Sequence, residues 1–389
     1  MLNLNALQKQ FAGFGRYQVQ EQNRRSLILE NALEVFRRYD PLQYQATPPG
    51  NTDAKSRPNK LMAVPLEVPT SIYDPTSRPT PLTVVATDGS QIYPDRNVEP
   101  LCYLLNVGRI AFQYGTTERP LMDAMPHLYF KGQELASVSG LEIDVVGQEI
   151  VSAMRDELEL GALVDLAIDA RQNGRPILAL ADGTLIRWMI KRLRKPELEQ
   201  KLLQRYFDAL DKFKSNEIPL CSYISMPGNA EFINYLSRYM VTGEEPAEKL
   251  LFEGISDRMF FKEVLKPGQR SATFKSESLV LKEYPADQEI CYFYIHIEDA
   301  GRGSEIARVE FPGWMVTSPD VLNLVHSTVL SECQKGKGYP MILSEAHEHA
   351  IIRSQERFMF YEMIEREMLM QGATLEISSK KTSKDSPVL

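Results

Sequence analysis

A long hydrophobic run is missing from this 389-residue chain, in which hydrophobic residues amount to 43% and charged residues to 25%. No segment approaches the roughly 18 consecutive apolar residues that a membrane-spanning helix needs. The N-terminus also lacks a basic stretch followed by an apolar core, so no secretory signal is predicted. These features indicate a globular protein with no membrane association and a cytoplasmic location.

Cysteine and histidine are scarce, with four and five residues respectively. The cysteines are widely separated and form no CxxC pair, so neither disulfides nor a zinc site is expected, and a reducing compartment fits. Basic residues number 44 against 52 acidic ones, which gives a net charge of −8. That balance argues against a protein that coats nucleic acid electrostatically, although it leaves open an enzyme with a local basic channel.

The chain divides into segments of different composition. Residues 1–46 are predicted to form a helical segment, because apolar residues recur at spacings of three and four. Residues 47–82 are rich in Pro, Ser, Thr, Asn and Asp and are predicted to be a linker or an irregular arm. Strands mixed with helices through 83–376 predict an α/β domain with a mixed β-sheet flanked by helices, in which 240–285 is interpreted as an insertion. The tail 377–389 is predicted to be disordered.

Two apolar runs end in the same way, with Asp-Gly followed by a hydroxyl residue: VVATDGS contains Asp88 and LALADGT contains Asp182. Both runs are short and bounded, as buried strands are. Strand ends of α/β proteins are where ligands bind, and two carboxylates side by side would suit a divalent metal. Gly89 and Gly183 are expected to let the chain turn sharply and a ligand approach closely. The alternative for each motif alone is an ordinary Asp-Gly turn.

A third carboxylate is predicted on a helix over 144–172. Leucine and alanine residues mark the buried side of this helix, and Glu159 lies beside that apolar stripe. A carboxylate at this boundary can reach a metal at the sheet end. The alternative is that the segment MRDELE is an ordinary solvated helix face.

Towards the C-terminus, His347 is expected in the first turn of a helix that Ser344 caps. Such a helix terminus attracts anions, and a histidine there can bind a metal, orient a phosphate or donate a proton. Tyr339 precedes this helix and can bond a phosphate or a water; for both residues a purely local role stays open. A basic helix is also predicted over 185–213, and its cations form either a DNA-binding patch or a solvated face: Arg187, Lys191, Arg192, Arg194 and Lys195.

Taken in order, these motifs resemble the NurA nuclease family of DNA-end-processing enzymes. The resemblance spans about 83–375 and depends on five elements in sequence, no one of which is specific alone. They are Asp88-Gly-Ser, the helix pattern Arg155-Asp-Glu-Leu-Glu159, Asp182-Gly-Thr-Leu, Gly-Tyr339-Pro, and His347 eight residues further on.

The resemblance implies an RNase H-like core in which Asp88, Glu159, Asp182 and His347 bind manganese or magnesium and Tyr339 completes the catalytic set. Glu157 is the alternative to Glu159. Hard divalent cations favour carboxylate oxygens, and in a two-metal site one ion activates the attacking water while the other stabilises the leaving oxygen. The resemblance further implies 5′–3′ exonuclease and single-strand endonuclease activity in DNA end resection and double-strand break repair. It also implies a homodimer that works with a HerA-type hexameric ATPase.

Three other classes of protein share some of these motifs or requirements. A phosphatase of the haloacid dehalogenase type needs a nucleophile two residues before the second motif's aspartate, where this chain has Leu180. An actin-like or sugar-kinase-like phosphotransferase shares strand–Asp–Gly–Thr turns but needs a Gly-rich adenosine site, for which GRGS at 301–304 is a weak candidate. A non-catalytic ring subunit that docks a motor ATPase would not require all five candidate residues.

Overall fold

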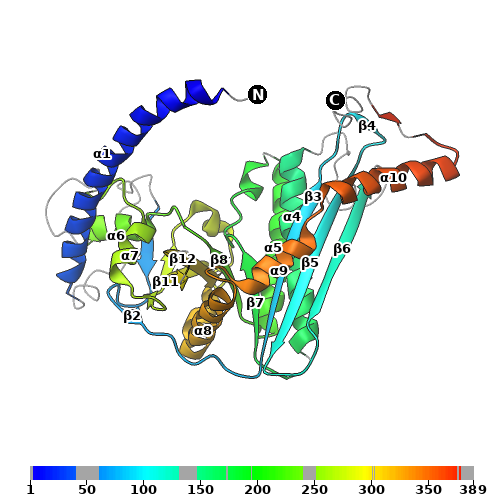
Figure 1. Ribbon diagram of the computed structural model, residues 1–389. Helices are drawn as coiled ribbons and strands as arrows, with labels where there is room; N and C mark the ends of the chain where they lie inside the picture. Colours follow the sequence, from blue (N-terminus) through cyan, green and yellow to red (C-terminus); the bar gives the residue numbers. More distant parts are fainter. Residues whose placement is uncertain are drawn as a thin grey trace.

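The computed structural model describes residues 3–40, 61–130, 147–171, 174–193, 195–239, 251–299, 301, 303–374 and 376–377. One large mixed sheet runs through the centre of the molecule, with helices packed on both of its faces (Figure 1). None of the described helices combines the length and the apolar character that crossing a bilayer requires.

Half of this sheet consists of five strands in the order β6 (Leu121–Phe130), β5 (Cys102–Tyr114), β3 (Leu82–Ile92), β7 (Ile177–Asp182) and β8 (Leu220–Ile224). Strand β5 pairs antiparallel with both β6 and β3, whereas β3, β7 and β8 run parallel. Parallel strands need crossover connections, which α4 (Gln148–Arg171) and α5 (Pro196–Ser215) complete on the way to β7 and β8. This strand order is that of an RNase H-like core, and the predicted fold class is confirmed.

Antiparallel strands extend the sheet beyond β8, in the order β12 (Gly303–Pro312), β11 (Ile290–Asp299), β10 (Phe274–Ser276) and β1 (Ala63–Pro65). A branch leaves β11 through β9 (Arg270–Ser271) to β2 (Ile72–Tyr73). Strands β1 and β2 come from the Pro-rich stretch that precedes the core. A separate two-stranded sheet joins β4 (Val98–Glu99) to β13 (Glu376–Ile377).

Different helices cover the two faces of the RNase H-like half. Apolar side chains of α4 and α5 pack on one face, against residues such as Val85 and Ala179. On the other face, α8 (Pro319–Lys335) and α9 (Met341–Ala350) pack against Val84 and Leu180. The alternation of neighbouring residues between faces follows from the pleat of a strand, and strands buried on both faces explain the continuous apolar runs in the sequence.

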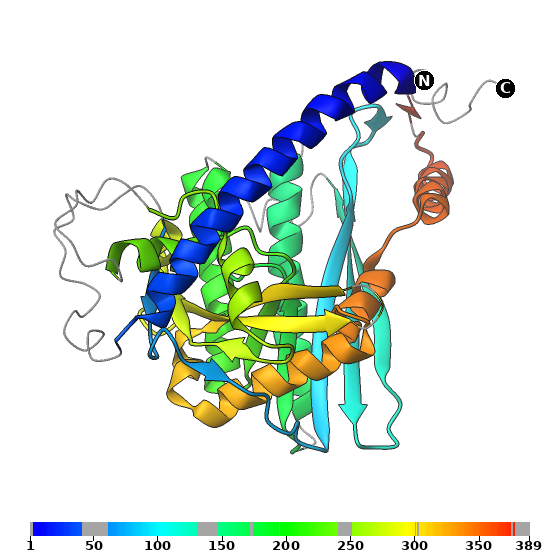
Figure 2. The ribbon, with the colours of Figure 1, turned by 60° about the vertical axis from the view of Figure 1, so that its left-hand side comes forward.

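The far half of the sheet carries a second helical layer, made of α6 (Glu231–Tyr239), α7 (Asp257–Val264) and the C-terminal half of α1 (Leu4–Arg37). Ala32 and Phe36 of α1 are buried there among phenylalanines of α6 and α7. Figure 2 shows α1 running across this layer and on past the body. The predicted N-terminal helix is therefore present, and only its second half is packed on the body.

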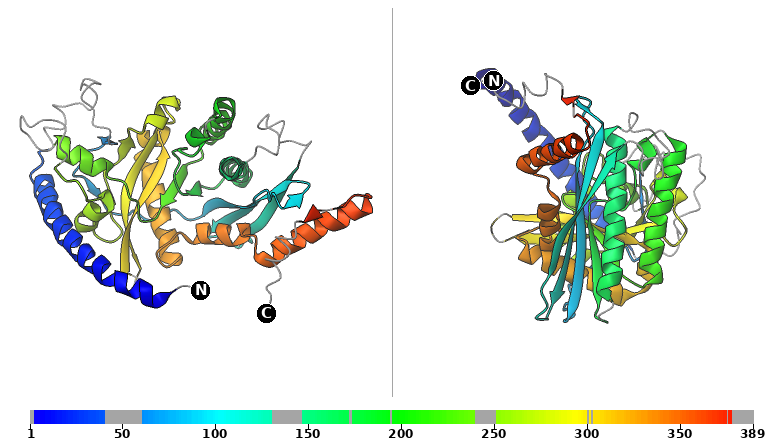
Figure 3. Two further views of the ribbon diagram at one scale, coloured as in Figure 1. Left: turned by 90° about the horizontal axis from the view of Figure 1, so that it is seen from above. Right: turned by 90° about the vertical axis from the view of Figure 1, so that its right-hand side faces the viewer.

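Two helices extend away from the body at opposite ends of the sheet (Figure 3). One is the N-terminal half of α1, where large apolar side chains such as Phe11 and Phe14 are exposed. The other is α10 (Ser354–Met370), which has no buried residue. Three short 3-10 helices complete the described elements: η3 (Ile190–Arg192), η4 (Leu279–Glu283) and η5 (Gly313–Thr317).

The prediction of a single basic helix over 185–213 is wrong. Residues 185–193 form a turn and the short η3, and the regular helix begins at Pro196. Proline lacks an N–H and clashes with the preceding turn inside a helix, but it is well tolerated in the first turn. Pro196 was the available signal that the helix starts there.

Helix α9 lies very close to the sheet because β5 has a glycine beneath it. A Cβ atom on Gly108 would lie 2.5 Å from the carbonyl oxygen of Ala346 and 2.7 Å from the amide nitrogen of Ala350. Both are backbone atoms of α9 and its end, so the contact cannot be relieved by turning a side chain. Gly108 thereby sets the distance between α9 and the strands.

We expect Gly108→Ala to lower the free energy of unfolding by about 1–3 kcal/mol, because α9 must shift to make room for the methyl group. Urea denaturation measures the change. Gly161→Ala on α4 is the matched control, since a Cβ there meets nothing within 4 Å and alanine is the better helix former. Equal stability of the two variants would contradict the packing argument.

Candidate active site

The two Asp-Gly motifs lie on adjacent parallel strands. Thr83 of β3 pairs with Ile177 of β7, and Ala86 pairs with Leu180, so paired residues are always 94 positions apart. Continuing this register by two residues brings Asp88 level with Asp182, the last residue of β7. In-register residues point to the same face of a sheet. The two carboxylates therefore lie side by side. Asp182 ends β7 as expected, but the prediction that Asp88 ends its strand is wrong, because β3 continues to Ile92.

The glycines after the two aspartates have different structural roles. Gly183 has a φ of +73°, and the chain turns there. Gly89, in contrast, stays in strand β3 and pairs with Val107 of β5, so the turn predicted at this position is wrong. A Cβ on Gly89 would overlap the Glu159 carboxyl group and lie 2.8 Å from Cγ of Arg155. The first glycine allows α4 to approach the strand that carries Asp88.

Glu159 is the carboxylate of α4 that lies against this strand. The hydroxyl of Thr87, next to Asp88, donates to the Glu159 backbone carbonyl at 2.9 Å. The Glu159 carboxylate lies 2.9 Å from Nε of Arg155, and its Oε1 atom is buried without a hydrogen bond of good geometry. Burial raises the pKa of Glu159 to about 8, and Asp88 adds to the rise while Arg155 opposes it.

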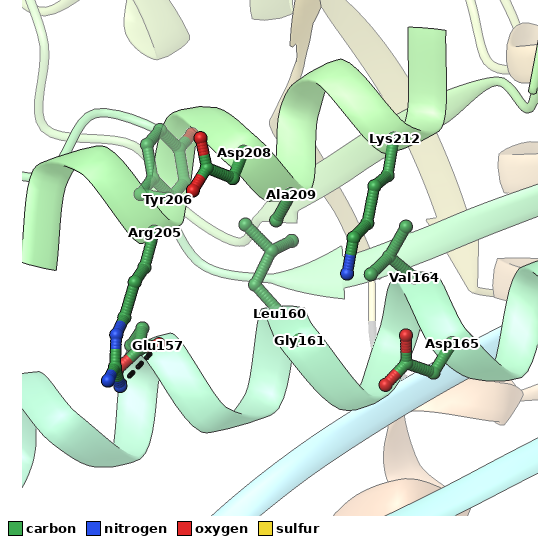
Figure 4. Close-up of a pocket in the computed structure, with 10 residues that line it drawn as sticks. All are labelled: Glu157, Leu160, Gly161, Val164, Asp165, Arg205, Tyr206, Asp208, Ala209 and Lys212. Atoms are coloured by element: carbon green, nitrogen blue, oxygen red, sulfur yellow. Dashed lines mark hydrogen bonds and ion pairs between the residues drawn. The ribbon is translucent and has the colours of Figure 1, made fainter. Parts of the chain in front are cut away.

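Glu157, the alternative third carboxylate, faces another part of the molecule. Figure 4 shows it in a groove between α4 and α5, where its oxygen lies 3.3 Å from the Arg205 guanidinium. Residues of a helix that are two apart do not share a face. Of these two glutamates, only Glu159 has Asp88 among the charges that shift its pKa.

Tyr339 and His347 each contact one of the two aspartates. The Tyr339 hydroxyl donates to Oδ1 of Asp182 at 2.8 Å, and Nδ1 of His347 lies 2.7 Å from Oδ2 of Asp88. Burial raises the pKa of Asp182, Asp88 raises it further, and the bond from Tyr339 counteracts both. The structure thus brings Asp88, Asp182, Tyr339 and His347 together, with Glu159 beside Asp88.

The expected position of His347 at a helix N-terminus is wrong. Helix α9 begins at Met341, directly after Pro340, and His347 lies in its last turn. The helix starts early because Glu332 of α8 accepts a hydrogen bond from the Ile342 N–H, which would otherwise lack a partner. A helix C-terminus favours a cation and not an anion, so the helix dipole does not prepare this histidine for phosphate.

Two side chains outside the predicted site residues hold the C-terminal end of α9. The hydroxyl of Ser90 and the amide of Asn106, from β3 and β5, both donate to the carbonyl of Ala350. Ser90 follows the first Asp-Gly, so the hydroxyl in that motif holds the helix that carries His347. Nothing local to the sequence links Ser90 or Asn106 with a residue more than 240 positions away.

The predicted basic patch does not form on a helix face. Arg187 stacks on the ring of Tyr206, with 4.7 Å between its guanidinium carbon and the ring centroid. Nζ of Lys191 lies 2.6 Å from the Glu283 carboxylate. Arg194 and the side chain of Arg192 lie outside the described residues.

The donor set suits a hard divalent cation, although no three Asp, Glu, His or Cys side chains of the described residues converge into a finished metal site. Three carboxylates and an imidazole are available, and one carboxylate oxygen of Glu159 is buried without a hydrogen bond. Asp88 raises the pKa of both Glu159 and Asp182 by repulsion between like charges. A cation among these groups would relieve that repulsion.

These features define the class of protein: an RNase H-like α/β fold with carboxylates gathered at the edge of its central strands. A family model of the NurA domain matches residues 82–352, well over half of the 389-residue chain. The chain therefore belongs to the NurA family, as the sequence motifs predict.

Matches among solved structures include the NurA nuclease from Sulfolobus solfataricus, at 13% identity and a TM-score of 0.45 over 77% of this chain and 87% of that one. LC9-RNase H1 matches at 13% identity and a TM-score of 0.21, over 40% of this chain and 69% of its own. RuvC from Thermus thermophilus matches at 11% identity and a TM-score of 0.17, over 44% and 86%. No significant relative was found among curated proteins.

The raised pKa of Glu159 has a consequence for stability. The folded chain holds this proton up to a pH of about 8, whereas an unfolded glutamate releases it near 4.5, so native stability falls as the pH rises through that window. Glu159→Gln carries no such charge. We expect its free energy of unfolding to gain on the wild-type value between the two ends of the window, in urea denaturation with a chelator present. Glu362→Gln, an exposed position on α10, is the control; parallel curves for wild type and Glu159→Gln would contradict the assignment.

Proposed function

We propose that this chain is a divalent-metal-dependent DNA nuclease that hydrolyses phosphodiester bonds. The observation that carries the proposal is the meeting of Asp88, Asp182, Tyr339 and His347, with Glu159 next to Asp88, inside a domain of the NurA family. By family resemblance, its activities are 5′–3′ exonuclease and single-strand endonuclease activity in DNA end resection and double-strand break repair. Four free cysteines are consistent with work in a reducing cytoplasm.

The ligands of manganese or magnesium would be Asp88, Glu159, Asp182 and His347. The bound cation would supply Lewis-acid stabilisation of charge on the phosphate and activation of water. The protein's own part is orientation: Tyr339 fixes the Asp182 carboxylate, and His347 fixes that of Asp88. With Nδ1–H donated to Asp88, the Nε2 atom of the exposed imidazole is the ring nitrogen left to bind the cation.

The proposal includes a homodimer and a HerA-type hexameric ATPase as partners, both by family resemblance. Exposed apolar side chains on the two projecting helices support interaction at these ends, since contiguous exposed apolar surface marks contact sites. On α1 these are Leu4, Phe11 and Phe14, and on α10 they are Phe358, Met359, Met363, Leu369 and Met370.

Substitution of the aspartate of either Asp-Gly motif tests the activity. We expect Asp88→Asn and Asp182→Asn to lose at least about a hundredfold in manganese-dependent digestion of end-labelled DNA, since metal-held charge stabilisation is worth several kcal/mol. Asp208→Asn, an exposed carboxylate on α5, is the matched control and should retain wild-type activity.

The outcome separates the proposal from its competitors. Full activity in both aspartate variants would place the chemistry elsewhere. ATP hydrolysis without DNA cleavage by the wild type would favour a phosphotransferase, and neither activity would favour a non-catalytic subunit that docks a motor.

Metal binding is testable without DNA. We expect Mn²⁺ to raise the melting temperature of the wild type, because it would bind the folded state and neutralise charges that repel one another. Glu159→Gln should lose most of this shift. Glu157→Gln should keep it, because Glu157 lies in the α4–α5 groove with Arg205. A shift lost in Glu157→Gln and kept in Glu159→Gln would reverse the assignment of the third carboxylate.

A further inference from the structure

The turn after Asp182 is fixed by a buried carboxylate from a different strand. Oε2 of Glu310, on β12, accepts a hydrogen bond from the Thr184 hydroxyl at 2.8 Å and from the Leu185 N–H at 2.9 Å. Glu310 is 1% exposed. Between Asp182 and this anchor there is only Gly183, whose N–H donates to the Tyr223 carbonyl at 3.0 Å.

Glu310 is itself fixed in place by a charge network in the interior. Its other oxygen accepts from Nε of Arg308 at 2.8 Å, and Nη1 of Arg308 donates to Glu231 at 2.8 Å. The Arg308 guanidinium, which is fully buried, lies over the ring of Tyr292 at 3.5 Å from the centroid. Buried charges must be paired and hydrogen-bonded to be tolerated, so these groups lock one another into a single arrangement.

The rest of the turn is anchored further from Asp182. The carbonyl of Leu185 accepts hydrogen bonds from the hydroxyls of Tyr206 at 2.6 Å and Tyr284 at 3.0 Å. These two tyrosines secure the chain after the turn. Glu310 is the side chain from another strand that accepts hydrogen bonds from the two residues directly after Asp182-Gly183, where the chain turns at a glycine with positive φ.

We propose that Glu310 is a positioning residue for Asp182: it holds the Thr184–Leu185 backbone so that the aspartate at the end of β7 stays aligned with Asp88. The role of Asp182 in DNA cleavage rests on the function proposed above, whereas the fixing of the turn does not. Because Glu231 begins α6, the same network ties the active-site turn to the helical layer on which α1 packs.

The test removes the hydrogen bond between the turn and Glu310 by changing Thr184 and leaving Glu310 in place. Glu310→Ala would strip Arg308 of a partner in the interior and endanger folding. Thr184→Val removes the hydroxyl of a half-buried residue, which donates to Glu310 and also accepts from the Ile186 N–H at 3.0 Å, and leaves the Glu231–Arg308–Glu310 network intact. Thr184→Ser restores the hydroxyl and is the rescue variant. Thr317→Val, whose native hydroxyl donates to the Trp314 carbonyl within η5, is the matched control.

Hydrogen–deuterium exchange of the Leu185 amide, which donates to Glu310 and not to Thr184, is the first measurement and is made on the metal-free full chain. We expect exchange at least about tenfold faster in Thr184→Val, with wild-type rates in Thr184→Ser and Thr317→Val, because opening of the turn becomes easier. Unchanged exchange in Thr184→Val would overturn the proposal, whatever the protein's activity.

Kinetics on single-stranded DNA with Mn²⁺ supply the second measurement. A misplacement of about 1 Å can cost about a hundredfold in rate, so kcat should fall ten- to a hundredfold in Thr184→Val with little change in KM, and recover in Thr184→Ser. A wild-type kcat in Thr184→Val, alongside an inactive Asp182→Asn, would overturn the positioning role and leave the nuclease function standing. No cleavage by the wild type, with the exchange result as expected, would sink the nuclease function and leave the fixing of the turn standing.

Discussion

The parallel pairing of β3 with β7 is the constraint on which the site depends. A constant offset of 94 residues between paired positions sets Asp88 level with Asp182, and a slip of one residue would turn one of the two carboxylates to the opposite face. The two helical layers then meet the sheet at this edge. Glu159 arrives from α4 on one face, and Tyr339 and His347 arrive with α9 from the other.

Close approach of these layers depends on two glycines that stand in strands and not in turns. Gly89 leaves room for the Glu159 side chain, and Gly108 leaves room for the backbone of α9. The contact at Gly108 is made to backbone atoms, which cannot move without displacing α9, whereas the contact at Gly89 is made to the side chains of Glu159 and Arg155. The hydroxyl of Ser90 and the amide of Asn106 then hold the end of α9 through the Ala350 carbonyl. Gly89, which the sequence places in a turn, is therefore a packing position within a strand, as is Gly108.

Much of this arrangement could be predicted from the sequence, because apolar runs, strand ends and helical spacing are local signals. The α/β class, the placing of Asp88 and Asp182 on buried strands and the helix that carries Glu159 follow from such patterns, whereas the continuation of β3 beyond Asp88 does not. The start of α9 could not be predicted, because its first free N–H is satisfied by Glu332 of the preceding helix and not by a cap within the segment. Glu310 was equally hidden: its contact with Thr184 spans 126 positions. The strand position of Gly89 could not be predicted for a related reason, since only its neighbours in space, Glu159 and Arg155 of α4, show that a helix packs against it.

Gathering carboxylates at one edge costs electrostatic free energy, and each carboxylate of the site has its own compensating group. Arg155 lies beside Glu159, Tyr339 donates to Asp182, and the His347 ring contacts Asp88. The compensation is incomplete at Glu159, where burial dominates and lifts the pKa to about 8. Under the proposed function, a bound cation would stabilise the charged form of this buried carboxylate and relieve its repulsion with Asp88. Each of these side chains contacts its own neighbour, and in the part of the chain that the structure describes they do not converge on a common centre.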